Sequence, residues 1–229
     1  MKTFAFIFAR GGSKGLPGKN ILKLNDKPLL AYSIDIAKQI DDISRIFVST
    51  DDESISNVAI EYGAEVINRP PELAQDDTPE WLAWKHAVEW VNNNGEEFNR
   101  FISLPTTSPL RNELDVKACL DKLDKDTDIV VTVADTCRSP YFNMVREEHG
   151  YFKLLIDTEA NYSRRQDVPK AYDMSTVAYV TRPEFIMKAN KIFDGRVKAV
   201  YIPPERAIDI DTKLDFLVAE TLIKLTKET

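Results

Sequence analysis

Short runs of β-branched and aromatic residues alternate along the chain with segments whose apolar positions recur at helical spacing. The first kind predicts strands at residues 3–8, 45–49, 65–67, 100–104, 128–133, 175–180 and 197–202. The second kind predicts helices at residues 29–39, 53–62, 79–92, 114–123, 183–189 and about 213–225. Such alternation is typical of parallel strands joined by right-handed helical crossovers. We therefore expect an α/β fold: a Rossmann-like, mostly parallel sheet with helices on both faces and ligands beyond the carboxyl ends of its strands.

The alternation is interrupted between about residues 135 and 173, where aromatic residues and the run SRRQDVPK follow one another without clear periodicity. This break favours an insertion at 136–170 within a single domain that spans residues 1–229. A lid, an arm and a dimer contact are the structures that such an insertion can form.

The net charge of −7 at pH 7 argues against nucleic acid or an anionic membrane as the main partner. The apolar run at 3–8 is too short for a signal segment or a membrane span, so we expect the buried first strand of a cytoplasmic protein. Cys119 and Cys137 show no CxxC spacing and are expected to be free thiols.

Four of the eight glycines lie between positions 11 and 18, directly after the first predicted strand. Arg10, Lys14 and Lys19 place three positive charges in the same loop. Glycine amides can form an anion-binding nest, and cations beside them suit a triphosphate. The spacing matches neither GxxxxGK[ST] nor GxGxxG, so the standard phosphate-binding motifs do not apply. A solvated loop with incidental lysines is the alternative.

Two aspartates, Asp209 and Asp211, stand just before the last predicted helix. In an extended segment alternate side chains share a face, so both carboxylates are expected to point the same way. Mg²⁺ commonly binds one or two carboxylates together with substrate phosphates. The alternative is that Asp211 only caps the helix, although Thr212 could do so instead. The neighbouring pair Asp51 and Asp52 is interpreted as a turn and a helix cap.

A hydroxyl-rich segment with two prolines follows the fourth predicted strand. We expect Thr106, Thr107, Ser108 and Arg111 to face the cleft at the strand ends and to recognise polar substrate groups. A rigid turn is the alternative.

Trp81 and Trp84 lie at helical spacing and are interpreted as core residues rather than a stacking platform. His86 and His149 have no serine or cysteine partner that the sequence places beside them, so triad chemistry is not predicted.

Several segments together resemble one known family, the acylneuraminate cytidylyltransferases or CMP-sialic acid synthetases. They are ARGGSKGLPGKN at 9–20, NRPPELAQD at 68–76, TSPLR at 107–111, RRQD at 164–167 and IDIDT at 208–212. The resemblance extends over nearly the whole chain. It implies transfer of cytidine monophosphate from CTP to a nine-carbon ulosonic acid, with Mg²⁺, by a homodimer whose subunits pair through the inserted arm.

The resemblance also implies roles for individual residues. The implied catalytic residues are Arg10, Lys14, Lys19, Arg165 and Asp211. The implied nucleotide-binding residues are Ala9, Arg10, Gly11, Gly12, Ser13, Asn20, Arg69, Asp77 and Thr78. The implied sugar-binding residues are Thr106, Thr107, Ser108, Arg165, Gln166 and Tyr172. Asp209 and Asp211 are the implied metal ligands.

The sugar side departs from the family pattern. Pro105 and Thr106 stand where a Gln-Pro pair is usual, residues 139–142 lack a usual lysine, and 172–176 lack an Asn-Gly pair. These departures favour an ulosonic acid other than ordinary sialic acid, with a legionaminic-type acid as the leading candidate. Three alternatives remain: a 3-deoxy-octulosonate enzyme, a GTP-using enzyme, and a non-catalytic nucleotide-binding regulator on the same scaffold.

Overall fold

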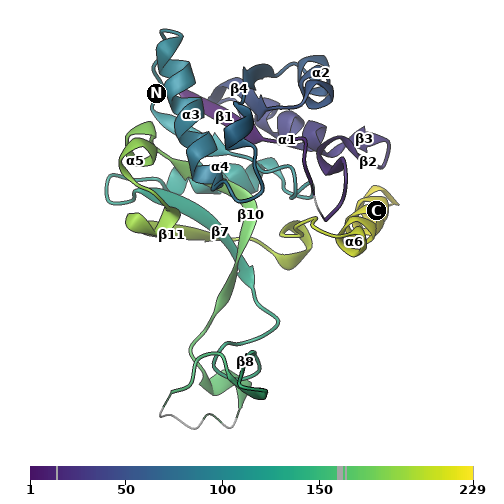
Figure 1. The fold of residues 1–229 in the computed structure, drawn as a ribbon, viewed down its shortest axis with the longest axis vertical. Coiled ribbons are helices and arrows are strands. Elements are labelled where there is room, and N and C mark those ends of the chain that lie inside the picture. The colour runs from purple at the N-terminus through teal and green to yellow at the C-terminus, as the bar shows by residue number, and fades with distance from the viewer. Residues whose placement is uncertain (14, 159–161, 163, 229) are drawn as a thin grey trace.

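A mixed β-sheet forms the centre of the molecule (Figure 1). The computed structural model describes residues 1–13, 15–158, 162 and 164–228. In these residues the sheet has seven strands in the order β11-β7-β10-β6-β1-β4-β5. The strands are β1 (Thr3–Phe8), β4 (Ile43–Thr50), β5 (Glu65–Asn68), β6 (Arg100–Ser103), β7 (Ile129–Asp135), β10 (Tyr172–Thr181) and β11 (Val197–Tyr201). The α/β, mostly parallel fold predicted from the alternation of strands and helices is therefore confirmed.

Helices cover both faces of the sheet. Successive side chains of a strand point to opposite faces, and apolar side chains on each face need a helix to bury them. Ala5 and Ile7 of β1 belong to the core cluster under helices α1, α2 and α4, whereas Phe4 and Phe6 belong to the cluster under α3 and α5. The helices are α1 (Leu29–Lys38), α2 (Glu53–Glu61), α3 (Glu80–Asn93), α4 (Glu113–Lys122), α5 (Pro183–Lys188) and α6 (Lys213–Glu228). Helix α6 packs at the edge of the body, where Ala219 joins Leu29 in a third, smaller cluster.

Strand β10 is antiparallel to both of its neighbours, β6 and β7. A helical crossover is needed only between parallel strands. Here the chain leaves the sheet at the end of β7 and returns along β10, without a helix longer than one short turn in the described part of that connection. This return explains why the regular alternation in the sequence stops near residue 135.

The ends of β7 and β10 project from the body as a long ribbon that carries a small hairpin (Figure 1). The hairpin pairs β8 (Val145–Glu148) with β9 (Tyr151–Leu154) through a turn at His149 and Gly150, whose φ angles are 53° and 82°. The sequence did not predict these strands, nor β2 (Lys23–Leu24) and β3 (Lys27–Pro28), because each is too short to show a period. The segment 136–170 is thus arm-shaped where the structure describes it.

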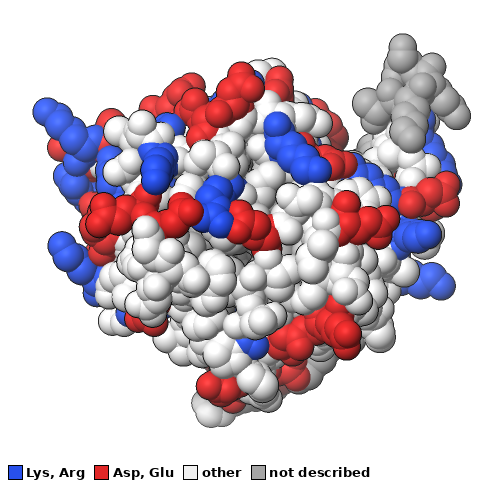
Figure 2. All heavy atoms as spheres, turned by 90° about the horizontal axis from the view of Figure 1, so that it is seen from above, with Lys and Arg blue, Asp and Glu red and all other residues white. Residues whose placement is uncertain are grey.

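Charged side chains of both signs are interleaved on the face of the body opposite the arm (Figure 2). None of the helices in the described part of the chain combines the length and the apolarity that a bilayer crossing requires.

Candidate active site

A pocket of about 670 Å³ opens at the carboxyl ends of β1, β5 and β6. Parallel α/β sheets place ligands at this edge because loops diverge there and leave space between them. The pocket is lined by Phe8, Arg10, Gly12, Ser13, Lys19, Asn20, Arg69, Leu73, Gln75, Asp76, Thr78, Pro79, Glu80, Trp81, Trp84, Pro105, Thr106, Thr107, Thr176, Tyr179, Asn190, Lys191, Ile192, Phe193, Asp209 and Asp211.

The glycine-rich turn forms one wall of the pocket and is held from behind. The backbone N–H of Gly11 donates to Asp51 Oδ1 at 3.0 Å, and Gly18 has a φ of 67°, which glycine adopts without strain. Ala9 is fully buried, so its backbone and not its side chain is what a ligand could contact. Lys14, which the sequence assigned to this turn, lies outside the described residues.

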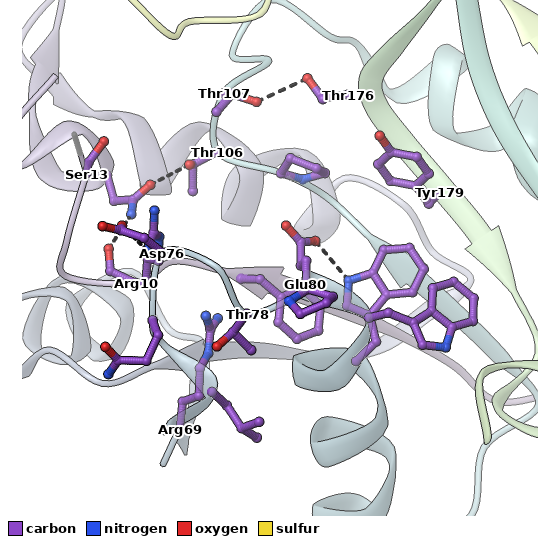
Figure 3. Close-up of a pocket in the computed structure, with 18 of the residues that line it drawn as sticks. Arg10, Ser13, Arg69, Asp76, Thr78, Glu80, Thr106, Thr107, Thr176 and Tyr179 are labelled. Carbon is purple, nitrogen blue, oxygen red and sulfur yellow. Dashed lines mark hydrogen bonds and ion pairs between the residues drawn. The ribbon is translucent and has the colours of Figure 1, made fainter. Parts of the chain in front are cut away.

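Asn20 ties this turn to the segment that follows β6. Its Nδ2 donates to the carbonyl of Arg10 at 2.9 Å, and its Oδ1 accepts from Thr106 Oγ1 at 2.6 Å (the latter bond is drawn in Figure 3). The side chain is almost fully buried. The two loops therefore hold a fixed position relative to one another without any ligand.

The amino-terminal turn also contacts the carboxyl-terminal acidic segment. Lys19 Nζ donates to the carbonyl of Ile210 at 2.7 Å and to Asp211 Oδ1 at 3.0 Å. Gly15 approaches the same segment so closely that an added Cβ would lie 2.4 Å from the carbonyl oxygen of Asp211. The sequence predicted that these two regions converge, and the structure confirms it.

Asp209 and Asp211 both line the pocket, as the alternation of side chains predicted, while Ile210 between them is fully buried. Burial raises the pKa of Asp209, and the neighbouring carboxylate of Asp211 raises it further. Hydrogen bonds from the hydroxyls of Thr107 and Thr176 lower the pKa of Asp209 and oppose these two effects. Asp209 Oδ1 is buried and has no hydrogen-bond partner within the described part of the chain. A buried carboxylate oxygen that no protein donor satisfies is suited to a cation, so this pair fits Mg²⁺.

Helix α6 has its own cap, so Asp211 is not needed there. Asp215 Oδ2 accepts from the N–H of Thr212 at 2.7 Å, and Thr212 Oγ1 accepts from the N–H of Asp215 at 3.3 Å. The described residues contain no group of three or more His, Cys, Asp or Glu placed to hold a metal. A cation at Asp209 and Asp211 would thus need ligands from water or substrate. Asp52 caps α2 by accepting from Ile55 N, as the sequence predicted.

Two arginines that line the pocket, Arg10 and Arg69 (labelled in Figure 3), are engaged by other groups of the protein. Arg10 Nη1 donates to Asp76 Oδ1 at 2.5 Å. Arg69 donates to the hydroxyl and carbonyl of Ser49 at 3.1 Å and 2.7 Å. Burial lowers the pKa of Arg69, although Glu80 and Asp51 raise it. Thr78 lines the pocket and Asp77 does not.

The hydroxyl segment after β6 only partly faces the pocket. Thr106 and Thr107 line it, but Ser108 is fully buried and bonds Thr176 Oγ1 at 2.7 Å. Arg111 is also buried: it donates to the carbonyl of Pro105 and to Ser33. Burial lowers the pKa of Arg111 to about 9. The expectation that Ser108 and Arg111 face the cleft was therefore wrong; both side chains instead hold the turn from behind.

Gln166 and Tyr172, two of the residues predicted to bind the sugar, do not line this pocket. Gln166 lines a second cavity of about 400 Å³ at the base of the arm, beside Arg138 and Lys170. Tyr172 is half exposed, with Lys170 Nζ 4.7 Å from the centre of its ring. The side chain of Arg165 lies outside the described residues.

Sequence reasoning missed part of the wall opposite the glycine turn. Thr176 and Tyr179 lie in the stretch of β10 where pairing with β7 is irregular, and such irregularities redirect side chains. Burial raises the pKa of Tyr179 to about 12. Trp81 and Trp84 are core residues, as predicted, but each also reaches the pocket lining. The alternation of side chains along a strand could not predict that Thr176 and Tyr179 line the pocket, because the pairing irregularity between Ser175 and Val180 interrupts that alternation.

A cationic glycine turn that faces paired carboxylates across a strand-end pocket is the arrangement of a nucleotidyltransferase. The model of the family described as "Cytidylyltransferase" matches residues 4–227, and the chain belongs to this family.

Named relatives agree with this assignment. The chain is 34% identical over 222 residues to a CMP-N,N'-diacetyllegionaminic acid synthase of Campylobacter jejuni, covering 96% of this chain and 94% of that protein. It is also 32% identical over 220 residues to an N-acylneuraminate cytidylyltransferase of Streptococcus agalactiae. That alignment covers 95% of this chain but 52% of the relative. A solved CMP:2-keto-3-deoxy-manno-octonic acid synthetase with CTP has a TM-score of 0.70 at 16% identity, over 100% of both chains, and shows the same fold.

Proposed function

We propose that this protein transfers cytidine monophosphate from CTP to a nine-carbon ulosonic acid of the sialic or legionaminic type and releases pyrophosphate. The observation that carries the proposal is the contact between Lys19 and Asp211, which brings the phosphate-binding turn and the acidic pair to the same pocket. Relatives named for legionaminic and N-acylneuraminic acids support the choice of acceptor. The departures of the sugar-side motifs favour the legionaminic-type acid.

The proposed reaction is an in-line substitution at the α-phosphorus. The anomeric hydroxyl of the sugar acid forms the new P–O bond and loses its proton to solvent, while the bond to pyrophosphate breaks. Lys19, Arg10 and the amides of the glycine turn, which line the pocket, would bind the phosphates and stabilise charge on the departing pyrophosphate. Positioning and electrostatics of this kind account for most of the catalysis in phosphoryl-transfer enzymes, so no histidine or cysteine nucleophile is required.

Asp209 and Asp211 are the residues that would hold Mg²⁺. When bound, the ion would neutralise charge at the α-phosphate and lower the pKa of the attacking hydroxyl. Lys19 would keep Asp211 oriented through its hydrogen bond to that carboxylate.

The arm is proposed to pair two copies of the chain. Its hairpin exposes Val145, Tyr151 and Phe152, the last two at 76% and 70% of their full accessibility. Light scattering coupled to size exclusion should give the mass of a dimer, and Phe152→Asp should shift it toward that of a monomer. A wild-type mass equal to that of a monomer would contradict pairing.

A substrate panel tests the proposed activity. Pyrophosphate release is measured with CTP, GTP, ATP and UTP, each with Mg²⁺, against sialic, legionaminic, pseudaminic and 3-deoxy-octulosonic acids. Release with CTP and a nine-carbon acid supports the proposal. Preference for the octulosonic acid or for GTP identifies one of the alternative enzymes, and a thermal shift with CTP but no release with any acid identifies a nucleotide-binding regulator.

A further inference from the structure

Glu80, the first residue of α3, directs a carboxylate into the pocket (Figure 3). Its Oε1 accepts a hydrogen bond from Trp84 Nε1 at 2.9 Å. The two residues are one helical turn apart, so the buried indole holds the carboxylate in this direction. The position was not expected from the sequence, where Glu80 reads as an ordinary acidic residue in the first turn of a helix.

Trp84 is the hydrogen-bond partner that the described residues give this carboxylate. No ion pair within 4.0 Å and no hydrogen bond other than that from Trp84 is found for it among the described residues. Desolvation raises the pKa of Glu80, while the bond from Trp84 and the charge of Arg69 lower it. Glu80 nevertheless stays accessible from the pocket, so its second oxygen can accept a hydrogen bond from a ligand.

The chemistry of the two substrates narrows what that ligand group can be. Phosphates and the carboxylate of the sugar acid are anionic and would be repelled by Glu80. The cations and amides that suit phosphates, at Lys19 and the glycine turn, do not contact Glu80 in the described structure. The partner of Glu80 must therefore be a neutral hydrogen-bond donor.

Tyr179 indicates which substrate supplies the donor. Trp84, which bonds Glu80, also packs against Tyr179 with the ring centroids 5.6 Å apart, and Glu80, Tyr179 and Asp209 all line the same pocket. If the reacting hydroxyl of the sugar acid lies at Asp209, the rest of that molecule extends into the same space beside Tyr179. Glu80 lines this pocket as well, and an ulosonic acid carries hydroxyl and amide N–H donors that a carboxylate can accept from.

Building on the proposed function, we propose that Glu80 is a specificity-determining residue that accepts a hydrogen bond from a hydroxyl or amide N–H of the sugar acid. The carboxylate favours acids with a donor at that position, because hydrogen bonds to a charged acceptor are stronger than those between neutral groups. Trp84 acts as a positioning residue that aims the carboxylate.

The test is Glu80→Gln, which keeps the length of the side chain and an oxygen that can accept from Trp84. With the acid that the wild type uses best, the KM for that acid should rise about 10-fold or more, since hydrogen bonds to charged groups are the stronger kind. The KM for CTP should stay within about two-fold. The matched control is Glu53→Gln, which removes the same charge from the first residue of α2, an exposed position outside the pocket. Thermal unfolding of both variants checks that they are folded.

Two other kinetic outcomes overturn the inference. A rise confined to the KM for CTP would mean that Glu80 contacts the nucleotide, and unchanged constants would mean that it contacts neither substrate. Calorimetric titration with the sugar acid alone distinguishes a failure of the Glu80 contact from a failure of the proposed reaction, because it measures binding without turnover. A wild type that binds the acid but releases no pyrophosphate contradicts the proposed reaction, yet weaker binding by Glu80→Gln would still support the contact. A wild type that binds no sugar acid overturns the contact as well.

Discussion

Lys19 Nζ lies 3.0 Å from Asp211 Oδ1, and 192 positions of sequence separate the two residues. The lysine side chain is 12% exposed and the aspartate 72%, so the pair sits where the buried turn meets the open pocket. An exposed ion pair contributes little to stability, so the role we assign to this pair is to hold the two segments next to one another. It joins the groups proposed to bind phosphate to those proposed to bind metal before any substrate arrives.

Removing the Asp211 carboxylate should abolish most turnover and leave the fold intact. Asp211→Ala is expected to lower the rate of pyrophosphate release by about 100-fold or more, as for loss of an electrostatic group at a reacting centre. Its thermal midpoint should match the wild type. Asp42→Asn is the control, because that exposed carboxylate pairs with Arg100 before β4, at the opposite edge of the sheet. Near-normal release by Asp211→Ala at low Mg²⁺ would contradict the metal assignment.

The close approach of Gly15 to Asp211 should make this glycine intolerant of a side chain. The added Cβ would lie 2.4 Å from a backbone carbonyl oxygen, so the turn or the acidic segment must shift. We expect Gly15→Ala to lower the free energy of unfolding in urea by about 1–3 kcal/mol. Gly12→Ala, where a Cβ meets nothing within 4 Å, should change it by less than about 0.5 kcal/mol. Equal effects of the two substitutions would show that the contact is not made in solution.

Asn20 should contribute to stability as well as to nucleotide binding. Asn20→Ala leaves the carbonyl of Arg10 and the buried hydroxyl of Thr106 without the partners they have now. The free energy of unfolding should fall by about 1–3 kcal/mol. As a comparison, Asn94→Ala removes an exposed bond to the carbonyl of Trp90 and should cost no more than about 1 kcal/mol. If both variants unfold alike, the bridge between the two loops is not a stabilising contact.

Asp124 should make stability depend on pH in the acid range. The hydrogen bond from Lys198, with a second from Thr127, lowers the pKa of Asp124 from 3.8 to about 2. A lowered pKa means that the folded state binds the proton more weakly than the unfolded state. The stabilisation is therefore complete above about pH 4 and is lost as the pH falls toward 2.

Thermal midpoints of the wild type and Asp124→Asn measure this effect. The variant should be less stable at neutral pH, and the gap should narrow below about pH 4. Asp121→Asn, which changes an exposed aspartate near the end of α4, is the charge-matched control for the general effect of removing one negative charge. A gap that stays constant down to pH 3 would contradict the assignment.

The amino-acid sequence by itself determined the regular layers of this protein. Strand β1 begins and ends where its apolar run does, and its alternating side chains divide between the two cores, because both features follow from local periodicity. The sequence also located the glycine turn and the acidic pair, since each is a cluster of unusual residues over a few positions.

Tertiary structure alone decided which side chains the pocket presents. Ser108 and Arg111 turned inward, where Ser108 bonds the hydroxyl of Thr176 and Arg111 donates to Ser33 and to the carbonyl of Pro105. Tyr179 turned toward the pocket because β10 is irregular where it returns beside β7. Glu80 became a pocket residue because Trp84 holds it and α3 begins at the pocket. Long-range pairing and packing set these directions, and no short window of sequence contains that information.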